Sequence, residues 1–509
     1  MSTVEDADFI FENTCSIREN AENKIWHRLK YFGSLRRKRH SLYPKVGILG
    51  CMAERLKDKL LEEGSVDLVV GPDGYRGIPA MMESVIKQGG EKLSCVDFSF
   101  DEHYADILPT RSPGEISAYI SIMRGCNNMC SFCIVPFTRG REKSRDFQSI
   151  VSEIRLLVAT QGVKEVLLLG QNVNGYHDAS AEAAALFPTR IHYRTSSEGF
   201  SNVFNSRQRS APGARFSDLL AAVAEIDPEL RVRFTSPHPK DFPPDVLQAI
   251  AAYPNLCSSL HMPLQSGSNA MLQKMRRGYS REAFLELVDA ARETIPRVTI
   301  STDVIAGFCG ETEEDHRDTL DIMSRVRFDQ AFMFAYSLRD KTHAARVFVD
   351  DVPEDVKLRR LQEIIDMFRT RAIEKNRTTE TNRVHLVLVE GLSHRQAAKD
   401  GAGAASCQWT GRTDGNKRVV FSIVSGADGL PMMPRFDVAS TELEQLADLD
   451  AIAARLLRDS GPQRSVSTDT LRGTYVAVKI LEANGTTLRG VALGGSSIAD
   501  WNQSRRFST

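Results

Sequence analysis

The feature that most constrains this chain is a short stretch with three cysteines, Cys126, Cys130 and Cys133, in the spacing C-x3-C-x2-C. Three thiolates on one loop can each bind one iron of a [4Fe–4S] cluster. The loop offers no fourth ligand, so the fourth iron would be open to a small chelating substrate. The alternative is a zinc knuckle or unrelated buried thiols, but four-ligand zinc sites usually consist of two paired halves. The nearest candidates for a second half, His103 and Cys257, lie far from the loop in sequence, which favours the cluster.

The length and composition of the chain are those of an ordinary soluble protein. Its 509 residues carry a formal net charge of −1, and 42% of them are hydrophobic and 26% charged. At roughly 150 residues per domain, this length predicts about three domains. No apolar run approaches the ~18 residues needed to span a membrane. Unevenly spaced cysteines do not resemble a secreted disulfide framework, and residues 1–8 do not resemble a targeting peptide. We therefore expect a protein of a reducing compartment.

Residues 1–100 alternate between short apolar runs and amphipathic segments, as expected of a doubly wound parallel sheet. Cys15 and Cys51 each stand where a predicted strand ends and a predicted helix begins. Ligands gather at that edge of open α/β sheets, so the two thiols could meet at one site; equally, they could be unrelated core thiols. The expected strands are 8–14, 46–50 and 66–70, and the expected helices are 16–32 and 52–63.

Residues 112–350 alternate strands and helices, which predicts a (β/α) barrel or partial barrel. Polar motifs follow strand after strand, so they should lie on the C-terminal face, where barrel active sites are built. Residues 178–214 are rich in Ala, Ser and Arg and lack clear periodicity, so we expect an irregular insertion there. The expected strands are 118–123, 165–170, 231–236, 258–262, 299–305 and 332–336.

The last part of the chain changes character after a helix expected at 354–376. Short strands and turn signals in residues 375–495 predict a small β-barrel, interrupted at 424–470 by an acidic, Ala-rich segment with one short helix. Basic residues give this region a mild positive bias: Lys375, Arg377, Arg383, Arg395, Arg412, Lys417 and Arg418. Another basic run, Arg36–Arg39, is expected to be a solvated loop or, alternatively, a phosphate contact for nucleic acid.

The sequence around the cysteines resembles the radical SAM enzymes, and among them the MiaB-type methylthiotransferases. The stretch Ile122–Cys133 is similar to their cluster motif, while Asn13–Ala21 and Gly50–Arg55 are similar to the N-terminal domain of methylthiotransferases. The resemblance implies a [4Fe–4S] cluster on the three loop cysteines, whose open iron chelates S-adenosylmethionine (SAM). It further implies reductive cleavage of SAM to a 5′-deoxyadenosyl radical, a reaction in which the cofactors carry the hard chemistry.

The same resemblance implies a second, auxiliary [4Fe–4S] cluster held by three cysteines of the N-terminal domain. Cys15 and Cys51 match the second and third ligands, whereas the first should lie on an earlier strand. No cysteine precedes Cys15, so the first strand–helix unit and its ligand are expected to be missing. Met1 could be an internal methionine, the chain could be an alternative isoform, or the auxiliary site could be degraded. The other cysteines match no ligand position and are expected to be ordinary thiols: Cys95, Cys257, Cys309 and Cys407.

For the rest of the chain, the family implies a partial (β/α)6 barrel and, at residues 375–495, a TRAM domain, which is an RNA-binding barrel. The segment Asp303–Asp315 resembles the family loop that packs along the SAM adenine, and Arg276–Tyr279 could face the substrate. The resemblance also places four polar residues near SAM or the substrate: Gln171, His238, Gln265 and Glu311. The alternative for each of the four is strand-end capping.

Three further stretches resemble the eukaryotic, mitochondrial branch of the family: Ser197–Phe200, Arg233–Asp241 and Asp350–Leu361. The resemblance implies a tRNA methylthiotransferase that converts N6-isopentenyladenosine at position 37 of tRNA to the 2-methylthio form, with SAM as radical source and methyl donor. The expected partners are tRNA and a ferredoxin- or flavodoxin-like electron donor. We expect a monomer without membrane contact, mitochondrial by its branch, with a cytoplasmic location as the alternative.

Other functions stay open at this point. Related methylthiotransferases act on threonylcarbamoyl-adenosine in tRNA or on a ribosomal-protein aspartate, although the mitochondrial-branch stretches argue against both. The mitochondrial branch was first named for association with a cyclin-dependent kinase activator. With its first auxiliary ligand missing, the chain could therefore also be a non-catalytic protein that binds RNA or such an activator.

Overall fold

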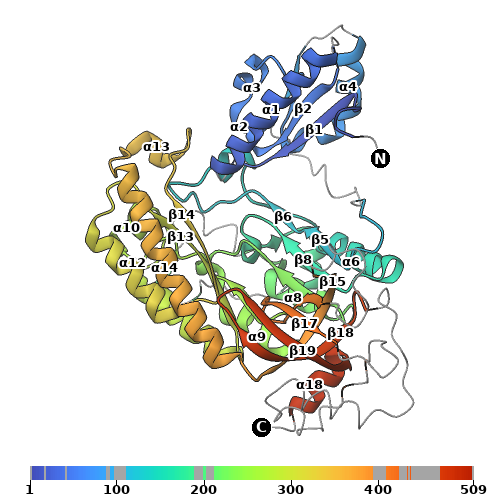
Figure 1. Ribbon diagram of the computed structural model, residues 1–509, viewed down its shortest axis with the longest axis vertical. Helices are drawn as coiled ribbons and strands as arrows, with labels where there is room; N and C mark the ends of the chain where they lie inside the picture. The colour runs from blue at the N-terminus through green and yellow to red at the C-terminus, as the bar shows by residue number, and fades with distance from the viewer. Residues whose placement is uncertain are drawn as a thin grey trace. The chain divides into compact units, whose positions relative to one another are not determined.

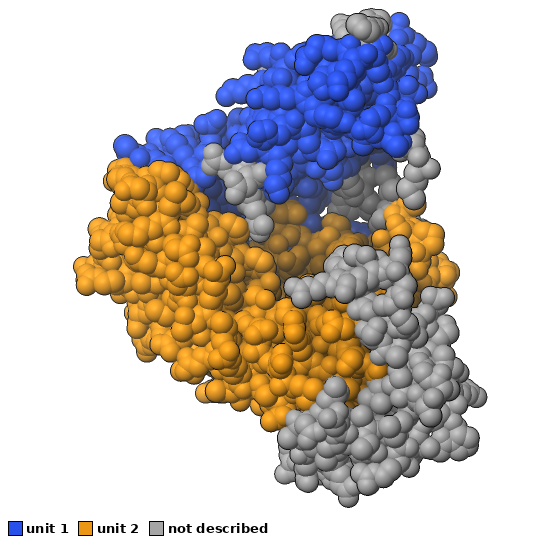
Figure 2. Space-filling model, viewed as in Figure 1, with its two compact units in different colours: residues 1–109, 123–145, 337–350 blue, residues 110–122, 146–336, 351–509 orange. Residues whose placement is uncertain are grey.

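The computed structural model consists of two compact units (Figure 1). Unit 1 comprises residues 1–109, 123–145 and 337–350, and unit 2 comprises residues 110–122, 146–336 and 351–509 (Figure 2). The described residues are 3–16, 19–39, 43–87, 92–96, 110–188, 196, 199–201, 211–393, 408–423, 433, 436 and 471–506. The cysteine loop therefore belongs to the same unit as the N-terminal segment, a grouping that the sequence did not indicate.

Unit 1 is built on a parallel sheet with the strand order β1–β2–β3–β4. Leu29 and Phe32 of α1 are buried against this sheet in one hydrophobic cluster with Ile48. The helix expected at 52–63 is broken into α2 and α3, because Lys57 adopts a left-handed backbone with φ of 40°. The elements are β1 (Phe9–Thr14), α1 (Glu19–Arg39), β2 (Lys45–Gly50), α2 (Cys51–Leu56), α3 (Asp58–Glu62), β3 (Leu68–Val70), η1 (Pro72–Gly77), α4 (Ile78–Lys87), β4 (Leu93–Cys95), β6 (Met123–Arg124), α5 (Val135–Thr138), β7 (Lys143–Ser144) and α13 (His343–Val347).

The basic run Arg36–Arg39 forms the last turn of α1, so the expectation of a loop was wrong. Cations are favourable there because the C-terminal end of a helix carries partial negative charge. Arg36 pairs with the buried carboxylate of Asp67, and Arg39 donates to the carbonyl of Ala7 at 3.1 Å. These two side chains are thus engaged in holding the fold, which weakens the alternative of a phosphate contact.

Unit 2 contains two parallel sheets whose strands follow chain order, which confirms the predicted α/β class. An isolated parallel bridge links Val232 of β11 to Leu256, which lies in the segment before β12. No helix among the described residues has the length and apolar character to cross a membrane. The strands are β5 (Ser117–Ser121), β8 (Glu165–Leu169), β11 (Arg231–Phe234), β12 (Ser259–His261), β13 (Thr299–Ala306) and β14 (Gln330–Ala335), and the helices are α6 (Phe147–Gln161), η2 (Val173–Gly175), α8 (Phe216–Ala224), η4 (Pro239–Asp241), α9 (Pro244–Ala252), α10 (Asn269–Lys274), α11 (Arg281–Thr294), α12 (Glu313–Val326) and α14 (Glu354–Thr379).

The insertion expected at 178–214 is more regular than its composition indicated. Its two ends pair as an antiparallel ribbon between β9 (His177–Asp178) and β10 (Ala214–Arg215), and α7 (Ala181–Leu186) follows the first strand. Ser196 donates from its amide to the carbonyl of Lys240 at 2.9 Å, so the insertion is anchored to the loop after β11. Residues 197 and 198, which resemble the mitochondrial branch, lie outside the described residues.

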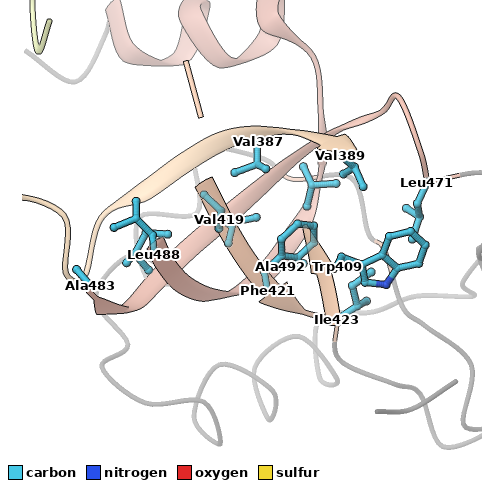
Figure 3. Close-up of a cluster of buried hydrophobic side chains, with 13 residues drawn as sticks. Val387, Val389, Trp409, Val419, Phe421, Ile423, Leu471, Ala483, Leu488 and Ala492 are labelled. Carbon is cyan, nitrogen blue, oxygen red and sulfur yellow. The ribbon is translucent and has the colours of Figure 1, made fainter. Parts of the chain in front are cut away.

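The C-terminal strands form a closed barrel in the order β15–β16–β17–β19–β18, as the turn signals predicted. Buried side chains that include Val387, Trp409 and Phe421 fill its interior (Figure 3). The expected interruption at 424–470 lies outside the described residues except for positions 433 and 436. The elements are β15 (Val384–Leu392), β16 (Gln408–Arg412), β17 (Arg418–Ser422), β18 (Tyr475–Ala483), β19 (Thr487–Ser496) and α18 (Ile498–Arg506).

The turn between β16 and β17 lies against the N-terminal ends of the parallel strands. Arg231 donates to the carbonyls of Arg412 and Leu386, each at 2.7 Å. Arg233 donates to the carbonyls of Thr413 and Asp414, each at 2.8 Å. The barrel turn therefore supplies hydrogen-bond acceptors for two buried guanidinium groups and packs against the face opposite the strand ends that carry the candidate site.

A partly buried carboxylate completes this contact. Glu165, the first residue of β8, accepts from Arg233 Nε at 2.7 Å. Burial alone would raise the pKa of Glu165, but Arg233 and Arg231 outweigh it, and the pKa is lowered. Glu165 and Arg233 are therefore both charged at neutral pH, and each depends on the other for neutralisation.

We predict that Arg233→Met lowers the free energy of unfolding by about 3 kcal/mol, because it removes the cation that hydrogen-bonds the partly buried carboxylate of Glu165 and the carbonyls of Thr413 and Asp414. Denaturant unfolding at neutral pH measures this change. Arg489→Met is the matched control, since Arg489 is exposed on the same barrel and lies 3.9 Å from Glu482. Equal unfolding midpoints for the two variants would contradict the proposed contact.

Candidate functional site

The cysteine loop of unit 1 is closed by a short antiparallel ribbon. Met123 pairs with Ser144 and Arg124 with Lys143, which ties the two ends of the loop together. Gly125 has φ of 71°, and a Cβ atom at this position would lie 2.1 Å from the carbonyl oxygen of Arg141. Only glycine fits there without moving the opposite backbone, so Gly125 fixes the turn that leads into Cys126.

The three thiols of the loop lie near one another. Cys130 is buried, while Cys126 and Cys133 are partly exposed. Burial raises the pKa of Cys126, and the neighbouring Cys133 and Cys130 raise it further. The Cys126 thiol therefore favours its protonated form, and metal ligation by a thiol replaces this proton with a positive centre.

Two buried polar groups in this loop fit an anionic cluster. Asn128 Nδ2 and Ser131 Oγ are buried and have no hydrogen-bond partner among the described residues. The amide of Asn128 donates to Cys126 Sγ at 3.5 Å, and the carbonyl of Ser131 accepts from the amide of Ala344 at 2.8 Å. Donors around sulfur ligands are a usual surrounding of iron–sulfur clusters, so these residues fit the predicted group.

The described side chains do not form a binding site for a single metal ion. No three His, Cys, Asp or Glu side chains in the described ranges are grouped around one point that could hold an ion. In a [4Fe–4S] cluster each cysteine binds a different iron, so the thiols of the loop need not converge on one centre.

Cys15 and Cys51 lie at the same edge of the unit 1 sheet, as their predicted positions at strand ends required. Thr14 and Gly50, the residues before them, are register partners in the parallel pair β1–β2. Gly50 has φ of 93°, and a Cβ atom there would lie 2.7 Å from the carbonyl oxygen of Thr14. This glycine lets the two strand ends approach closely and start α2 at Cys51.

Three of the polar residues predicted near SAM each follow a strand of unit 2 as expected. Gln171 follows β8, His238 follows β11 and Gln265 follows β12. His238 is buried, and its Nδ1 accepts from the amide of Lys240 at 3.3 Å, which leaves the ring proton on Nε2. The side chain of Asn174 holds the backbone of His238 by two hydrogen bonds of 2.8 Å.

Gln265 is held by its backbone and not by its side chain. Its φ is 71°, its amide donates to Asp303 at 2.8 Å, and its carbonyl accepts from Ile305 at 2.9 Å. Its side-chain amide has no hydrogen-bond partner in the part of the chain that the structure describes. A fixed backbone with an uncommitted amide is suited to binding a polar ligand.

Glu311, the fourth predicted residue, is engaged within the protein. Its Oε2 accepts from the amide of Gly307 at 2.7 Å and from Arg360 Nη1 at 3.0 Å, and its side chain is 1% exposed. Burial raises its pKa, although Gly307 and Arg360 act in the opposite direction. These contacts fix the loop after β13 against α14, which favours a positioning role for Glu311.

Sequence reasoning missed a polar chain on β12 and β13. His261 Nδ1 lies 2.9 Å from Ser301 Oγ, and His261 Nε2 lies 3.2 Å from Asp303 Oδ2. The signal was the spacing of Ser301 and Asp303, which stand two positions apart on β13 and therefore lie on one face of the strand. The ring of Phe332 from β14 packs edge-on against His261 on the same side.

The residues Arg276–Tyr279 serve mainly to support the loop before Gln265. Arg277 is buried and donates to the carbonyl of Pro263 at 2.7 Å, and the hydroxyl of Tyr279 donates to the same carbonyl at 3.1 Å. Their contact with a substrate stays a prediction, and any such contact would have to come from the parts of these side chains that remain accessible.

The basic residues predicted to favour RNA differ in their availability. Lys375 and Lys417 both pair with Asp329, at 2.8 and 2.9 Å, and Lys417 also pairs with Glu380. Arg412 pairs with Glu390 at 3.0 Å. Arg395 lies outside the described residues, and the exposed ones are Arg377, Arg383 and Arg418.

Comparisons with known proteins show which families and proteins the chain is similar to. Residues 120–323 match the Radical SAM superfamily, and residues 1–71 match the Uncharacterized protein family UPF0004. The chain is 44% identical over 517 residues to the mitochondrial tRNA methylthiotransferase CDK5RAP1 of Homo sapiens, covering 98% of this chain and 77% of that protein. It is 46% identical over 421 residues to a tRNA-2-methylthio-N(6)-dimethylallyladenosine synthase of Phocaeicola vulgatus, covering 82% of this chain and 83% of that protein. Among solved structures, the radical S-adenosylmethionine methyltransferase TsrM of Kitasatospora setae has a TM-score of 0.46 at 16% identity, covering 66% of this chain and 64% of that one.

We predict that Gly125→Ala lowers the iron bound by the cysteine loop by roughly half or more. The added Cβ would clash with the opposite backbone, and the residue has a positive φ. Iron and sulfide would be measured after anaerobic reconstitution in a Cys15→Ala/Cys51→Ala background, so that only this loop is counted. Gly162→Ala is the matched control, since Gly162 has φ of 62° but no atom within 4 Å of the added Cβ. Equal iron in both variants would show that the turn at Gly125 is not needed.

Proposed function

This chain belongs to the radical SAM methylthiotransferases, and from that premise we propose that it adds a 2-methylthio group to N6-isopentenyladenosine in tRNA. The observation that carries the proposal is the 44% identity over 98% of the chain with a relative named as a tRNA methylthiotransferase. The name of the bacterial relative states the product, since dimethylallyl and isopentenyl denote the same group here. The loop with three thiols supplies the ligand set that such chemistry requires.

Cys126, Cys130 and Cys133 are assigned the [4Fe–4S] cluster and so the radical step. When bound, the cluster supplies the electron for reductive cleavage of SAM. The chain itself fixes the sulfurs, because the β6–β7 ribbon closes the loop and Gly125 shapes its turn. The amide of Asn128 stabilises negative charge on the Cys126 sulfur.

Gln171, His238 and Gln265 are assigned to SAM or substrate, because each follows a parallel strand at its carboxyl end. Gln265 is the strongest of the three, since its side-chain amide keeps its hydrogen-bonding capacity for a ligand. Glu311 acts differently in this proposal: it holds the loop of residues 307–311 in place through Gly307 and Arg360.

Cys15 and Cys51 are assigned to an auxiliary [4Fe–4S] cluster that carries the sulfur to be transferred, with the methyl group coming from a second SAM. The support is the register of β1 and β2, which sets both thiols at one sheet edge. Because two thiols do not complete the ligand set of such a cluster, the proposal requires a further ligand.

The C-terminal barrel of residues 375–495 is proposed to be a TRAM domain that contacts tRNA. The support is its closed five-stranded form and the exposed cations Arg377, Arg383 and Arg418, which can neutralise phosphates. The N-terminal domain at 1–100 and the radical SAM core at 112–350 complete the proposed order. We further propose a monomer in mitochondria that takes electrons from a ferredoxin- or flavodoxin-like protein.

Methylthiolation of threonylcarbamoyl-adenosine is the second candidate, and a non-catalytic RNA- or kinase-activator-binding protein is the third. The bacterial relative named for the dimethylallyl product disfavours the second. The three cysteines of the loop, with the backbone N–H of Asn128 donating to the Cys126 sulfur, disfavour the third.

The test is a nucleoside profile of tRNA that carries N6-isopentenyladenosine, incubated anaerobically with reconstituted chain, SAM and reductant. We expect 2-methylthio-N6-isopentenyladenosine from the unaltered chain and from Cys257→Ala, which removes a thiol outside the loop. The variant with Cys126, Cys130 and Cys133 all changed to Ala should form none. A product only on threonylcarbamoyl-adenosine tRNA would replace the proposal by its alternative, and no product on either would overturn it.

A further inference from the structure

Arg139, which follows the loop of three cysteines, contacts Cys51, one of the two thiols at the edge of the unit 1 sheet. Arg139 comes directly after α5, the short helix that follows Cys133. Its Nε donates to Cys51 Sγ at 2.9 Å, although the two residues are 88 positions apart in the chain. Both lie in unit 1, so the contact is internal to one compact body.

The surroundings hold this arginine in place. Helix α5 packs against α2, which begins at Cys51. The amide of Arg139 donates to the carbonyl of Val135 at 2.8 Å, which fixes the start of its side chain. The side chain of Arg139 is thus held at its backbone and at its guanidinium, so its contact with the sulfur has a defined geometry.

Tyr75, a residue of η1, also lies near this contact. Its hydroxyl lies 3.4 Å from Asn13 Oδ1, and Asn13 stands two residues before Cys15. Burial raises the pKa of Tyr75 and the charge of Arg139 lowers it, so the phenol lies near the guanidinium. Arg139 is itself partly buried, so the effect of its cation on a sulfur is less screened than at the surface.

We propose that Arg139 is a positioning residue for the auxiliary cluster: it holds the Cys51 sulfur and raises the reduction potential of the cluster bound there. A fixed cation and an N–H donor next to a ligand sulfur favour the more negative, reduced state of a cluster. Arginine stays charged at every working pH, so the effect is permanent. The same contact ties the loop of Cys126, Cys130 and Cys133 to the auxiliary thiol.

This inference rests on the auxiliary cluster of the proposed function, and its test separates the two. The background is the Cys126→Ala/Cys130→Ala/Cys133→Ala chain, which can hold only the auxiliary cluster. Iron and sulfide are counted first. Midpoint potentials are then measured by redox titration followed by electron paramagnetic resonance. The added changes are Arg139→Gln, Arg139→Lys and, as matched control, Arg141→Gln, which removes a nearby exposed cation of the same loop.

We expect the midpoint potential to move to more negative values in Arg139→Gln, to move less in Arg139→Lys, and to stay in place in Arg141→Gln. Loss of the cluster in the Arg139 variants alone, with unchanged thermal unfolding, would support the positioning role too. Unchanged potentials in Arg139→Gln, or a cluster loss that accompanies an equal loss of thermal stability, would overturn the inference. If no cluster forms while Arg139 is intact, the auxiliary-cluster part of the proposed function fails, and the inference with it.

Discussion

The parallel pairing of β1 with β2, which sets Thr14 opposite Gly50, is the interaction on which the candidate site of unit 1 depends. Because parallel strands end at the same edge, Cys15 and Cys51, which follow these partners, lie at one edge of the sheet. Unit 2 applies the same rule to other chemistry, since its polar candidates follow β8, β11, β12 and β13 at their carboxyl ends. Strand direction therefore gathers functional groups that are far apart in the chain.

The opposite ends of the unit 2 strands hold two buried arginines that donate hydrogen bonds to the C-terminal barrel. Arg231 and Arg233 would be costly to bury without acceptors, and the turn between β16 and β17 supplies those acceptors from its backbone. Arg231 also packs over the ring of Tyr475 at 5.1 Å. The C-terminal barrel is thus bound to the N-terminal ends of the unit 2 strands, and the carboxyl ends carry the residues proposed to contact SAM or substrate.

The sequence was sufficient for features encoded locally. The spacing of Cys126, Cys130 and Cys133, the alternation of strands and helices, and the closed barrel all follow from short-range pattern. Contacts between residues far apart in the chain could not be predicted from the sequence. The contact of Glu311 with Arg360 joins residues 49 positions apart, and the contact of Arg139 with Cys51 joins two motifs that the sequence presents separately. The polar chain of His261 required the register of β12 with β13.

The central claim is that this chain generates a radical from SAM at its cysteine loop. The most direct measurement is the 5′-deoxyadenosine formed from SAM by the reduced, reconstituted chain, compared with a variant that has Cys126, Cys130 and Cys133 changed to Ala. We predict 5′-deoxyadenosine from the unaltered chain and none from the variant. A reconstituted chain that binds iron and sulfide at the loop yet yields no 5′-deoxyadenosine, or a variant that yields as much, would contradict the claim.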